Sequence, residues 1–187
     1  MEKEKIKQLN KPQVFYSSKE TSNCPYIPNI IQTVSEIKKH ELFENLSEII
    51  ISHRYAKRIV INTESKTLNR DDFIEVVDYD PLKNIFLIMG SKHPRDETSI
   101  HWMIHHAREE INTVIQINSK KILEKKYKNT SKIEEDYINA SLDQIKEILR
   151  NLRDSKIVDI KNHGLLFVGN NLNEINKSIF NLKLGRE

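Results

Sequence analysis

The stretch that decides the fold is "PRDETSIHWMIHHAREEINTVIQINS", residues 94–119. Beyond Pro94 the apolar residues recur three or four positions apart, which predicts an amphipathic helix. These residues are Ile100, Met103, Ile104, Ala107 and Ile111. Asp96 precedes the run and is the candidate N-cap of the helix. The β-branched segment 111–118 predicts a strand directly after it.

Segments before this stretch extend the pattern. Short runs rich in β-branched and aromatic residues predict strands at 48–55, 58–63, 73–80 and 84–90. The turn "DPLKN" joins the last two strands, which implies that they pair antiparallel. Between Asn29 and about Glu48, helical spacing predicts one or two helices. The apolar residues that carry this spacing are Ile30, Ile31, Val34, Ile37, Leu42, Phe43 and Leu46.

Segments after the stretch continue the alternation. Ser141 and Gln144 form a capping-box pattern, so we expect a helix from there to about Arg153. The segment "KIVDIKNHGLLFVGN", residues 156–170, predicts two strands around His163 and Gly164, and residues 172–182 predict a closing helix. Strands that alternate with helices, together with the hairpin, indicate an α/β protein.

Composition limits the classes of protein. A chain of 187 residues fits one domain, because single domains commonly contain about 50 to 250 residues. The 30 Lys and Arg are interspersed with 27 Asp and Glu, so we do not expect nucleic-acid binding, and the basic run 120–128 is interpreted as a solvated face. With one cysteine, Cys24, no signal-peptide pattern and only short apolar runs, we expect a cytoplasmic protein without membrane segments.

The N-terminal segment follows no sustained period. Residues 1–28 mix Lys, Ser, Pro and aromatic residues, which predicts an irregular arm ahead of a domain over residues 29–187. Lys, Ile and Asn are common throughout the chain, and such a bias can reflect the base composition of a genome. Most individual lysines and asparagines are therefore given no functional weight.

From about Ser47 to its C-terminus the chain resembles the class II aldolase and adducin family. Residues 94–119 are similar to the family's Pro-Ser-Ser-Glu segment, its helix and its strand that ends His-x-His. "KNHGLLFVGNNLNEI", residues 161–175, resembles the family's His-Gly stretch, and "ISHRY", residues 51–55, resembles its Ser-x-Arg element. The resemblance implies a class II aldolase-like α/β fold, with a central mainly antiparallel sheet flanked by helices. It also implies a homo-oligomer, often a tetramer, and a small sugar-like ligand.

The resemblance implies a metal site that has lost ligands. Family members hold zinc with three histidines beside a glutamate, because imidazole binds Zn²⁺ while the ion polarises a substrate carbonyl. Carried over residue by residue, the catalytic glutamate is Glu97 and the remaining metal ligand is His163, whereas Gln116 and Asn118 occupy the other two ligand positions. Amides are poor zinc ligands, so we expect no cofactor or at most a weakly held zinc.

The family's phosphate-binding positions differ as well. Ile49 and Ile50 stand at the place of a Gly-Asn turn, and "NTESK", residues 62–66, replaces a glycine-bearing loop. Arg95 and Asp96 stand where the family has two serines. Arg95 is the candidate substrate-binding residue, since its guanidinium can attract an anion, whereas Asp96 repels a phosphate.

Several residues have two interpretations. Glu97, His101 and His105 recur four positions apart, a spacing by which a helix can present metal ligands. In the other interpretation His101 packs beneath the sheet, while His105 and His106 lie at the helix surface. Trp102 is interpreted as a core or subunit-contact residue rather than a substrate platform.

Two classes of function remain open. In the favoured one, the protein has lost aldolase activity and serves through binding or assembly. In the alternative, it is a lyase or related enzyme that acts on a sugar or sugar-phosphate carbonyl compound through Glu97 and His163.

Overall fold

The structure, a computed structural model, describes residues 11–39 and 45–182. In these ranges nine strands form one sheet, in the order β1-β5-β4-β3-β2-β6-β9-β8-β7. The strands are β1 (Gln13–Ser18), β2 (Ile49–Tyr55), β3 (Arg58–Asn62), β4 (Phe73–Asp80), β5 (Ile85–Met89), β6 (Thr113–Ile117), β7 (Ser131–Ile133), β8 (Ile157–Ile160) and β9 (Gly164–Gly169). Pairing is antiparallel except at the two ends, where β1 runs parallel to β5 and β7 runs parallel to β8.

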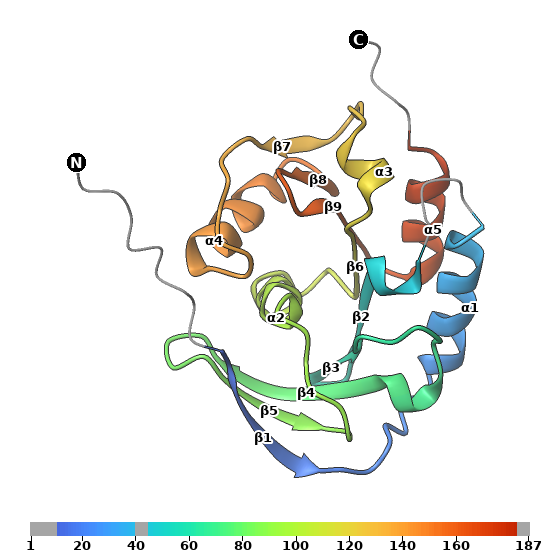
Figure 1. The fold of residues 1–187 in the computed structure, drawn as a ribbon, viewed down its shortest axis with the longest axis vertical. Helices are drawn as coiled ribbons and strands as arrows, with labels where there is room; N and C mark the ends of the chain where they lie inside the picture. The colour runs from blue at the N-terminus through green and yellow to red at the C-terminus, as the bar shows by residue number, and fades with distance from the viewer. Residues whose placement is uncertain (1–10, 40–44, 183–187) are drawn as a thin grey trace.

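Helices cover both faces of the sheet, which curls around α2 (Figure 1). The helices are α1 (Ile27–Ile37), α2 (Thr98–Ala107), α3 (Lys120–Leu123), α4 (Leu142–Asn151) and α5 (Leu172–Phe180), with short 3-10 turns at Leu46–Glu48 and Arg70–Asp72. Helix α2 contacts β3, β4 and α4 inside the curve, whereas α1 and α5 lie side by side on the opposite face. The predicted fold class, a mainly antiparallel sheet flanked by helices, is confirmed.

Burial follows the apolar patterns of the sequence. The apolar face of α1 packs with α5, and β6 is buried along its whole length because it lies between β2 and β9. A second cluster joins Ile100 and Ile104 of α2 to Ile145 and Ile148 of α4. Burying large aliphatic side chains stabilises a fold by roughly 1.5–3 kcal/mol each, so these two clusters hold the helices on their faces.

The predicted elements and the structure differ in detail in two helical segments. Helix α2 begins after Glu97 rather than Asp96, and no side chain caps it, because residues 95–97 already form a turn in which the amide of Thr98 donates to the carbonyl of Arg95. The helical pattern between Asn29 and Glu48 gives α1 and a 3-10 turn, and its residues Leu42 and Phe43 lie outside the described part of the chain.

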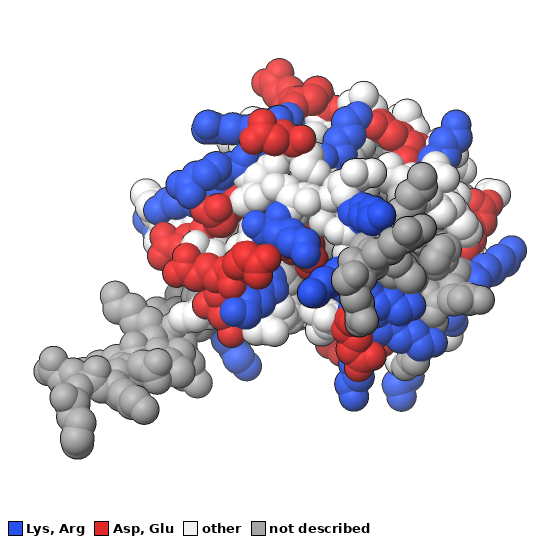
Figure 2. Space-filling model, turned by 90° about the horizontal axis from the view of Figure 1, so that it is seen from above, with Lys and Arg blue, Asp and Glu red and all other residues white. Residues whose placement is uncertain are grey.

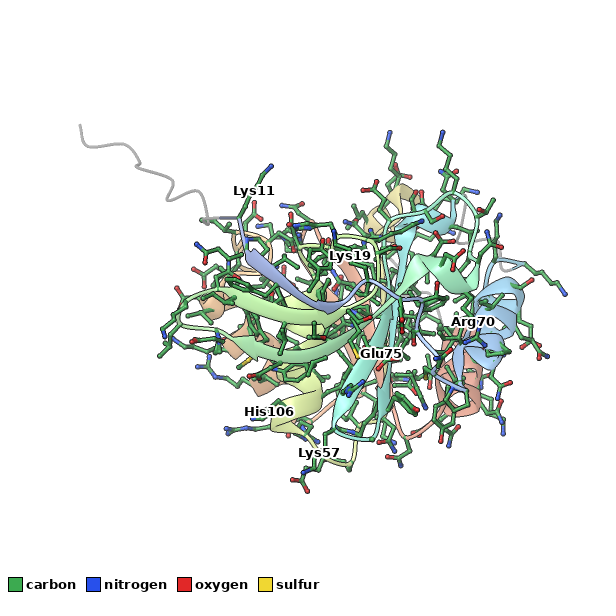
Figure 3. All side chains as sticks on the ribbon, turned by 90° about the horizontal axis from the view of Figure 1, so that it is seen from below. Lys11, Lys19, Lys57, Arg70, Glu75 and His106 are labelled. Carbon is green, nitrogen blue, oxygen red and sulfur yellow. The ribbon has the colours of Figure 1, made fainter. Side chains whose placement is uncertain are left out.

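Part of the segment expected to be irregular is a strand. Residues 13–18 form β1 at the edge of the sheet, and the following residues lead to α1 past Glu75 (Figure 3). Ser22 Oγ donates to Glu75 Oε1 at 2.6 Å, and Arg58 Nη1 donates to Glu75 Oε2 at 2.9 Å. Most residues of this edge strand are exposed, so no buried face imposes alternation on its sequence, which explains why the pattern missed it.

The surface carries mixed charge. Lys and Arg are interspersed with Asp and Glu on the face shown in Figure 2. Within the basic run 120–128, Ile122 and Tyr127 are buried and Lys121 is half-buried. The other residues of the run are exposed. Burial raises the pKa of Tyr127 to about 12. None of the helices in the described residues is long and apolar enough to cross a membrane.

Gly164 is sterically required where β9 starts. Its φ is +85°, and a Cβ there would overlap the backbone carbonyl of Ile117 in β6. We expect Gly164→Ala to lower the free energy of unfolding by roughly 3 kcal/mol or more, because strain at a positive φ and overpacking add. Urea denaturation followed by circular dichroism measures the change.

Asn162→Gly is the matched control two residues away. Asn162 also has a positive φ, of 62°, and glycine adopts that conformation without strain. Its stability should stay close to that of the wild type. Equal stabilities for the two variants would contradict the close approach of β9 to β6.

Candidate functional site

Gln116, at one of the matched ligand positions, lies in the centre of the sheet. It pairs with Ile50 of β2 and Leu166 of β9, and its side chain is fully buried. Gln116 Nε2 donates to the backbone carbonyl of His163 at 3.2 Å, and Gln116 Oε1 has no hydrogen-bond partner within the described residues. The amide therefore ties β6 to the turn that precedes β9.

His163 is also engaged with the backbone. Its Nε2 lies 3.1 Å from the carbonyl oxygen of Tyr137, in the segment between β7 and α4. A carbonyl oxygen can only accept a hydrogen bond, so Nε2 carries the proton. A metal needs an unprotonated nitrogen, which in this tautomer is Nδ1 rather than Nε2.

Glu97 and Arg95 lie together at the start of α2. Asn139 Nδ2 donates to Glu97 Oε1 at 3.2 Å, and Arg95 Nε lies 3.8 Å from Glu97 Oε2. Arg95 Nη2 donates to the carbonyl of Ser47 at 2.9 Å. Tyr137 and Asn139 belong to one short segment, so residues 134–141 contact both the candidate glutamate and the candidate histidine.

The residues at the matched positions do not fit a zinc site. Asn118 is exposed and Gln116 is buried with its amide bonded to backbone, so of the three matched positions only His163 presents an imidazole. Over residues 11–39 and 45–182, no three His, Cys, Asp or Glu side chains gather closely enough to hold a metal ion. The phosphate positions differ too, because Ile49 and Ile50 are fully buried in strand β2 rather than placed in an open turn.

The histidines of α2 form a buried network with Ser52 of β2. Ser52 Oγ lies 2.8 Å from His101 Nδ1 and 2.8 Å from His105 Nε2, and His105 Nδ1 lies 3.1 Å from the carbonyl of Ile111. Because that carbonyl accepts from Nδ1, Nε2 of His105 must accept the serine proton, and His101 Nδ1 then donates to Ser52. The three groups thus form one directed chain of hydrogen bonds.

This network explains the burial of two histidines. His101 lies beneath the sheet as expected, whereas the expectation that His105 lies at the helix surface is wrong, since only 2% of it is exposed. Both ring nitrogens of His105 have hydrogen-bond partners, which offsets the free-energy cost of burying them. Burial lowers the pKa of His105 to about 3 and lowers the pKa of His101 well below its usual value.

Arg54 fixes the other end of α2. Its Nη2 donates to the carbonyls of His105, Arg108 and Ile111 at 2.5, 3.2 and 3.0 Å. These carbonyls belong to the last turn of α2 and the residues after it, where a positive charge is favoured by the helix dipole. Ser52 and Arg54 therefore hold α2 against β2. Trp102, 8% exposed, packs with the core as expected.

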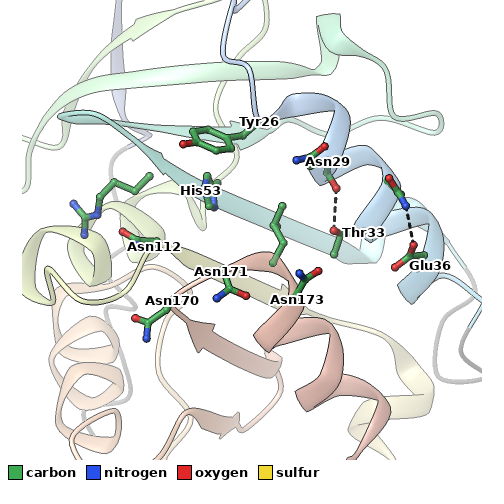
Figure 4. Close-up of a pocket in the computed structure, with 12 residues that line it drawn as sticks. Tyr26, Asn29, Thr33, Glu36, His53, Asn112, Asn170, Asn171 and Asn173 are labelled. Carbon is green, nitrogen blue, oxygen red and sulfur yellow. Dashed lines mark hydrogen bonds between the residues drawn. The ribbon is translucent and has the colours of Figure 1, made fainter.

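A cleft of about 630 Å³ lies between α1 and α5. Polar side chains dominate it, and Figure 4 shows asparagines facing Tyr26, His53 and α1 across the opening. The polar residues include Asn29, Thr33, His53, Asn112, Asn170 and Asn173. Asn112 precedes β6 by one residue, so the cleft lies about 13 Å along that strand from Gln116. It is separate from the matched ligand positions.

The charged and titratable groups around the cleft have hydrogen-bond partners within the protein. Glu36 accepts from Gln32 Nε2 at 3.1 Å and from Asn176 Nδ2 at 2.8 Å. His53 Nδ1 lies 2.8 Å from Thr113 Oγ1, and burial, with a smaller effect of the Arg54 charge, lowers the pKa of His53. The sequence analysis did not predict this cleft, because its asparagines come from three separated segments and fit no spaced motif.

Comparisons with known proteins support the fold. Neither a protein-family model nor a curated protein matches the chain. Among solved structures, an L-fuculose 1-phosphate aldolase is 13% identical with a TM-score of 0.67, over 86% of this chain and 82% of that one. A sugar-phosphate aldolase from Thermotoga maritima is 13% identical with a TM-score of 0.64, over 82% and 88%.

A third structure is itself a class II aldolase domain. It is the N-terminal class II aldolase domain of a conserved protein from Thermoplasma acidophilum, with 13% identity, a TM-score of 0.58 and coverage of 86% of this chain and 92% of that one. Identities this low establish the fold and leave function to the site itself. The chain has a class II aldolase-like fold, as the sequence predicted.

The histidine network predicts acid lability. Folded His105 stays neutral to about pH 3, whereas an unfolded histidine has a pKa of 6.5. Below pH 6.5 the unfolded chain therefore binds more protons, and the free energy of unfolding falls as pH falls, by about 1.4 kcal/mol per pH unit for each such histidine. Urea titrations between pH 4 and 7 measure the slope.

Two variants assign the slope to this network. Between pH 4 and 6, we expect His105→Gln to reduce the pH dependence of the free energy of unfolding by about 1.4 kcal/mol per pH unit, which corresponds to the uptake of one proton on unfolding. His106→Gln, which changes the exposed neighbour, should leave the slope as in the wild type. An unchanged slope in His105→Gln would show that the ring titrates normally in the folded protein.

Proposed function

We propose that this protein is a non-aldolase binding or assembly protein built on a class II aldolase-like fold. The observation that carries the proposal is the state of the matched ligand positions. Gln116 holds the backbone of His163, and His163 holds the backbone of Tyr137. The two side chains connect neighbouring segments through hydrogen bonds. They therefore have a structural role at positions where the family that the chain resembles has zinc ligands.

The surrounding contacts support the same conclusion. Glu97 accepts a hydrogen bond from Asn139, so the segment between β7 and α4 covers the carboxylate that a proton transfer would need. Ile49 and Ile50 are part of the core and bring no amides to an anion. An aldol cleavage of a phosphorylated sugar would lack its Lewis acid, its phosphate contacts and an open approach to Glu97.

The proposal includes assembly into a homo-oligomer, such as a tetramer, in the cytoplasm. The resemblance implies an oligomer, and β1 stands at the end of the strand order with one edge unpaired in the described sheet. Phe15 of β1 is 57% exposed, and Leu82 in the turn after β4 is 89% exposed. Apolar side chains beside an open strand edge are typical of contact surfaces.

The first test measures zinc and cleavage together. Protein purified without chelator should contain less than one zinc per chain, because amides replace two imidazoles. Incubation with L-fuculose 1-phosphate should give no cleavage above the buffer rate. Metal analysis and an assay for dihydroxyacetone phosphate provide both readouts. One tightly held zinc per chain, or substantial cleavage, would overturn the proposal.

A double variant provides the positive control. Gln116→His with Asn118→His restores imidazoles at both matched positions, so zinc affinity should rise by orders of magnitude while cleavage stays negligible. A zinc titration by calorimetry measures this rise. Failure of the variant to gain zinc, although folded, would mean that the residue-by-residue match along β6 is incorrect.

The second test concerns assembly. At micromolar concentration we expect a mass that is a multiple of the 22.0 kDa chain, because isologous contacts between identical surfaces form closed oligomers. Multi-angle light scattering measures the mass, and Phe15→Glu should reduce it if β1 contributes to the contact. A 22.0 kDa species throughout this range would refute the assembly proposal.

A further inference from the structure

We propose that the cleft between α1 and α5 binds an uncharged, hydroxyl-rich small molecule, such as a free sugar or polyol. Its volume of about 630 Å³ falls within the roughly 300–1,000 Å³ typical of small-molecule sites. The cleft is separate from the matched ligand positions. The inference therefore goes beyond the proposed function, and the two can fail independently.

The walls of the cleft are held in place. Thr33 Oγ1 donates to the carbonyl of Asn29 within α1, and Asn176 of α5 donates to Glu36 of α1 at 2.8 Å. Asn112 is fixed through its backbone, because its N–H donates to Gly169 at 3.0 Å and its carbonyl accepts from Arg54 at 2.8 Å. Side chains on such rigid elements are preorganised for a ligand.

Four carboxamides on these walls are free to bind. Within the described residues, the side chains of Asn29, Asn112, Asn170 and Asn173 make no hydrogen bond to the protein, and all four line the cleft (Figure 4). A carboxamide offers donors and an acceptor side by side. Adjacent hydroxyl groups also donate and accept, so a polyhydroxylated molecule complements several amides at once.

The charges around the cleft argue for an uncharged ligand. Both carboxylate oxygens of Glu36 already accept hydrogen bonds, and Arg54 Nη2 is held by three carbonyls. Burial lowers the pKa of His53, which favours the uncharged form of its ring. The lining thus carries one negative charge, on Glu36, and one positive charge, on Arg54, so its net charge favours neither a cation nor an anion.

The N-terminus of α5 is occupied by its own side chains. Asn171 Oδ1 accepts from the amide of Glu174 at 2.9 Å, and Glu174 Oε2 accepts from the amide of Asn170 at 2.8 Å. The other carboxylate oxygen of Glu174 pairs with Lys156, which holds the side chain in this position. A phosphate ester is therefore disfavoured at the helix end that opens into the cleft.

Tyr26 supplies an apolar wall. Its ring is 42% exposed and lies 4.7 Å from the ring of His53, centroid to centroid, which fixes its orientation. Leu172, which is 9% exposed, adds a small apolar contact at the start of α5. Amides around an aromatic side chain match a ligand that has hydroxyl groups at its rim and C–H groups on its faces.

The test uses the side-chain amide signals of ¹⁵N-labelled full-length protein. The probes are glucose, maltose, sucrose, sorbitol and inositol, each titrated to 50 mM, with glucose 6-phosphate for comparison. We expect saturable shifts of the NH₂ signals of Asn112, Asn170 and Asn173 with at least one neutral probe, and weaker binding of glucose 6-phosphate than of glucose.

Variants locate the binding. Asn29→Ala with Asn173→Ala removes two exposed amides, so the fold should be unaffected, and the dissociation constant should rise about tenfold or more. Asn23→Ala, an exposed asparagine outside the cleft, is the matched control and should bind like the wild type.

Three results would overturn the inference. They are no saturable shift with any neutral probe, equal binding by the double variant and the wild type, and tighter binding of glucose 6-phosphate than of glucose. None of these bears on zinc content or aldol cleavage, so the outcome is distinguishable from failure of the proposed function.

Discussion

The hydroxyl of Ser52, held between the rings of His101 and His105, fixes α2 inside the curved sheet, and the contacts at both ends of α2 depend on that position. The start of α2 carries Glu97 next to Arg95, and its end is held by Arg54 beside the cleft. A shift of α2 along β2 would displace Glu97 and break the contacts that Arg54 makes with the end of the helix. The network is fully hydrogen-bonded along its chain except at His101 Nε2, which is buried without a partner in the described residues.

Periodicity was enough to predict most of the fold. The strands that pair in the interior, such as β2 and β6, are apolar along their length, and α1 and α4 show helical spacing, so each carried a local signal. Strand β1 carried none, because most of its residues are exposed and its pairing with β5 is a long-range contact. The three-residue strand β7 was too short to establish a period.

The candidate site was predictable only in part. The resemblance assigned positions to Glu97, Gln116 and His163, and the residues at those positions could be read from the sequence. Their partners could not, because Tyr137 and Asn139 come from a segment with no pattern of its own. The cleft was missed for a related reason. Its amides meet only after α1, β6 and α5 pack together, and a common residue type carries little information before that happens.

Because Gly164 closely approaches the backbone of Ile117, different constraints act on Gly164 and on its neighbour His163. A side chain at position 164 collides with the backbone of β6 whether or not any chemistry takes place nearby, whereas position 163 is constrained by its contacts alone. A substitution can thus remove the imidazole at position 163 while the glycine at position 164 is retained. A motif search anchored on that glycine would recover descendants of the architecture irrespective of what they catalyse.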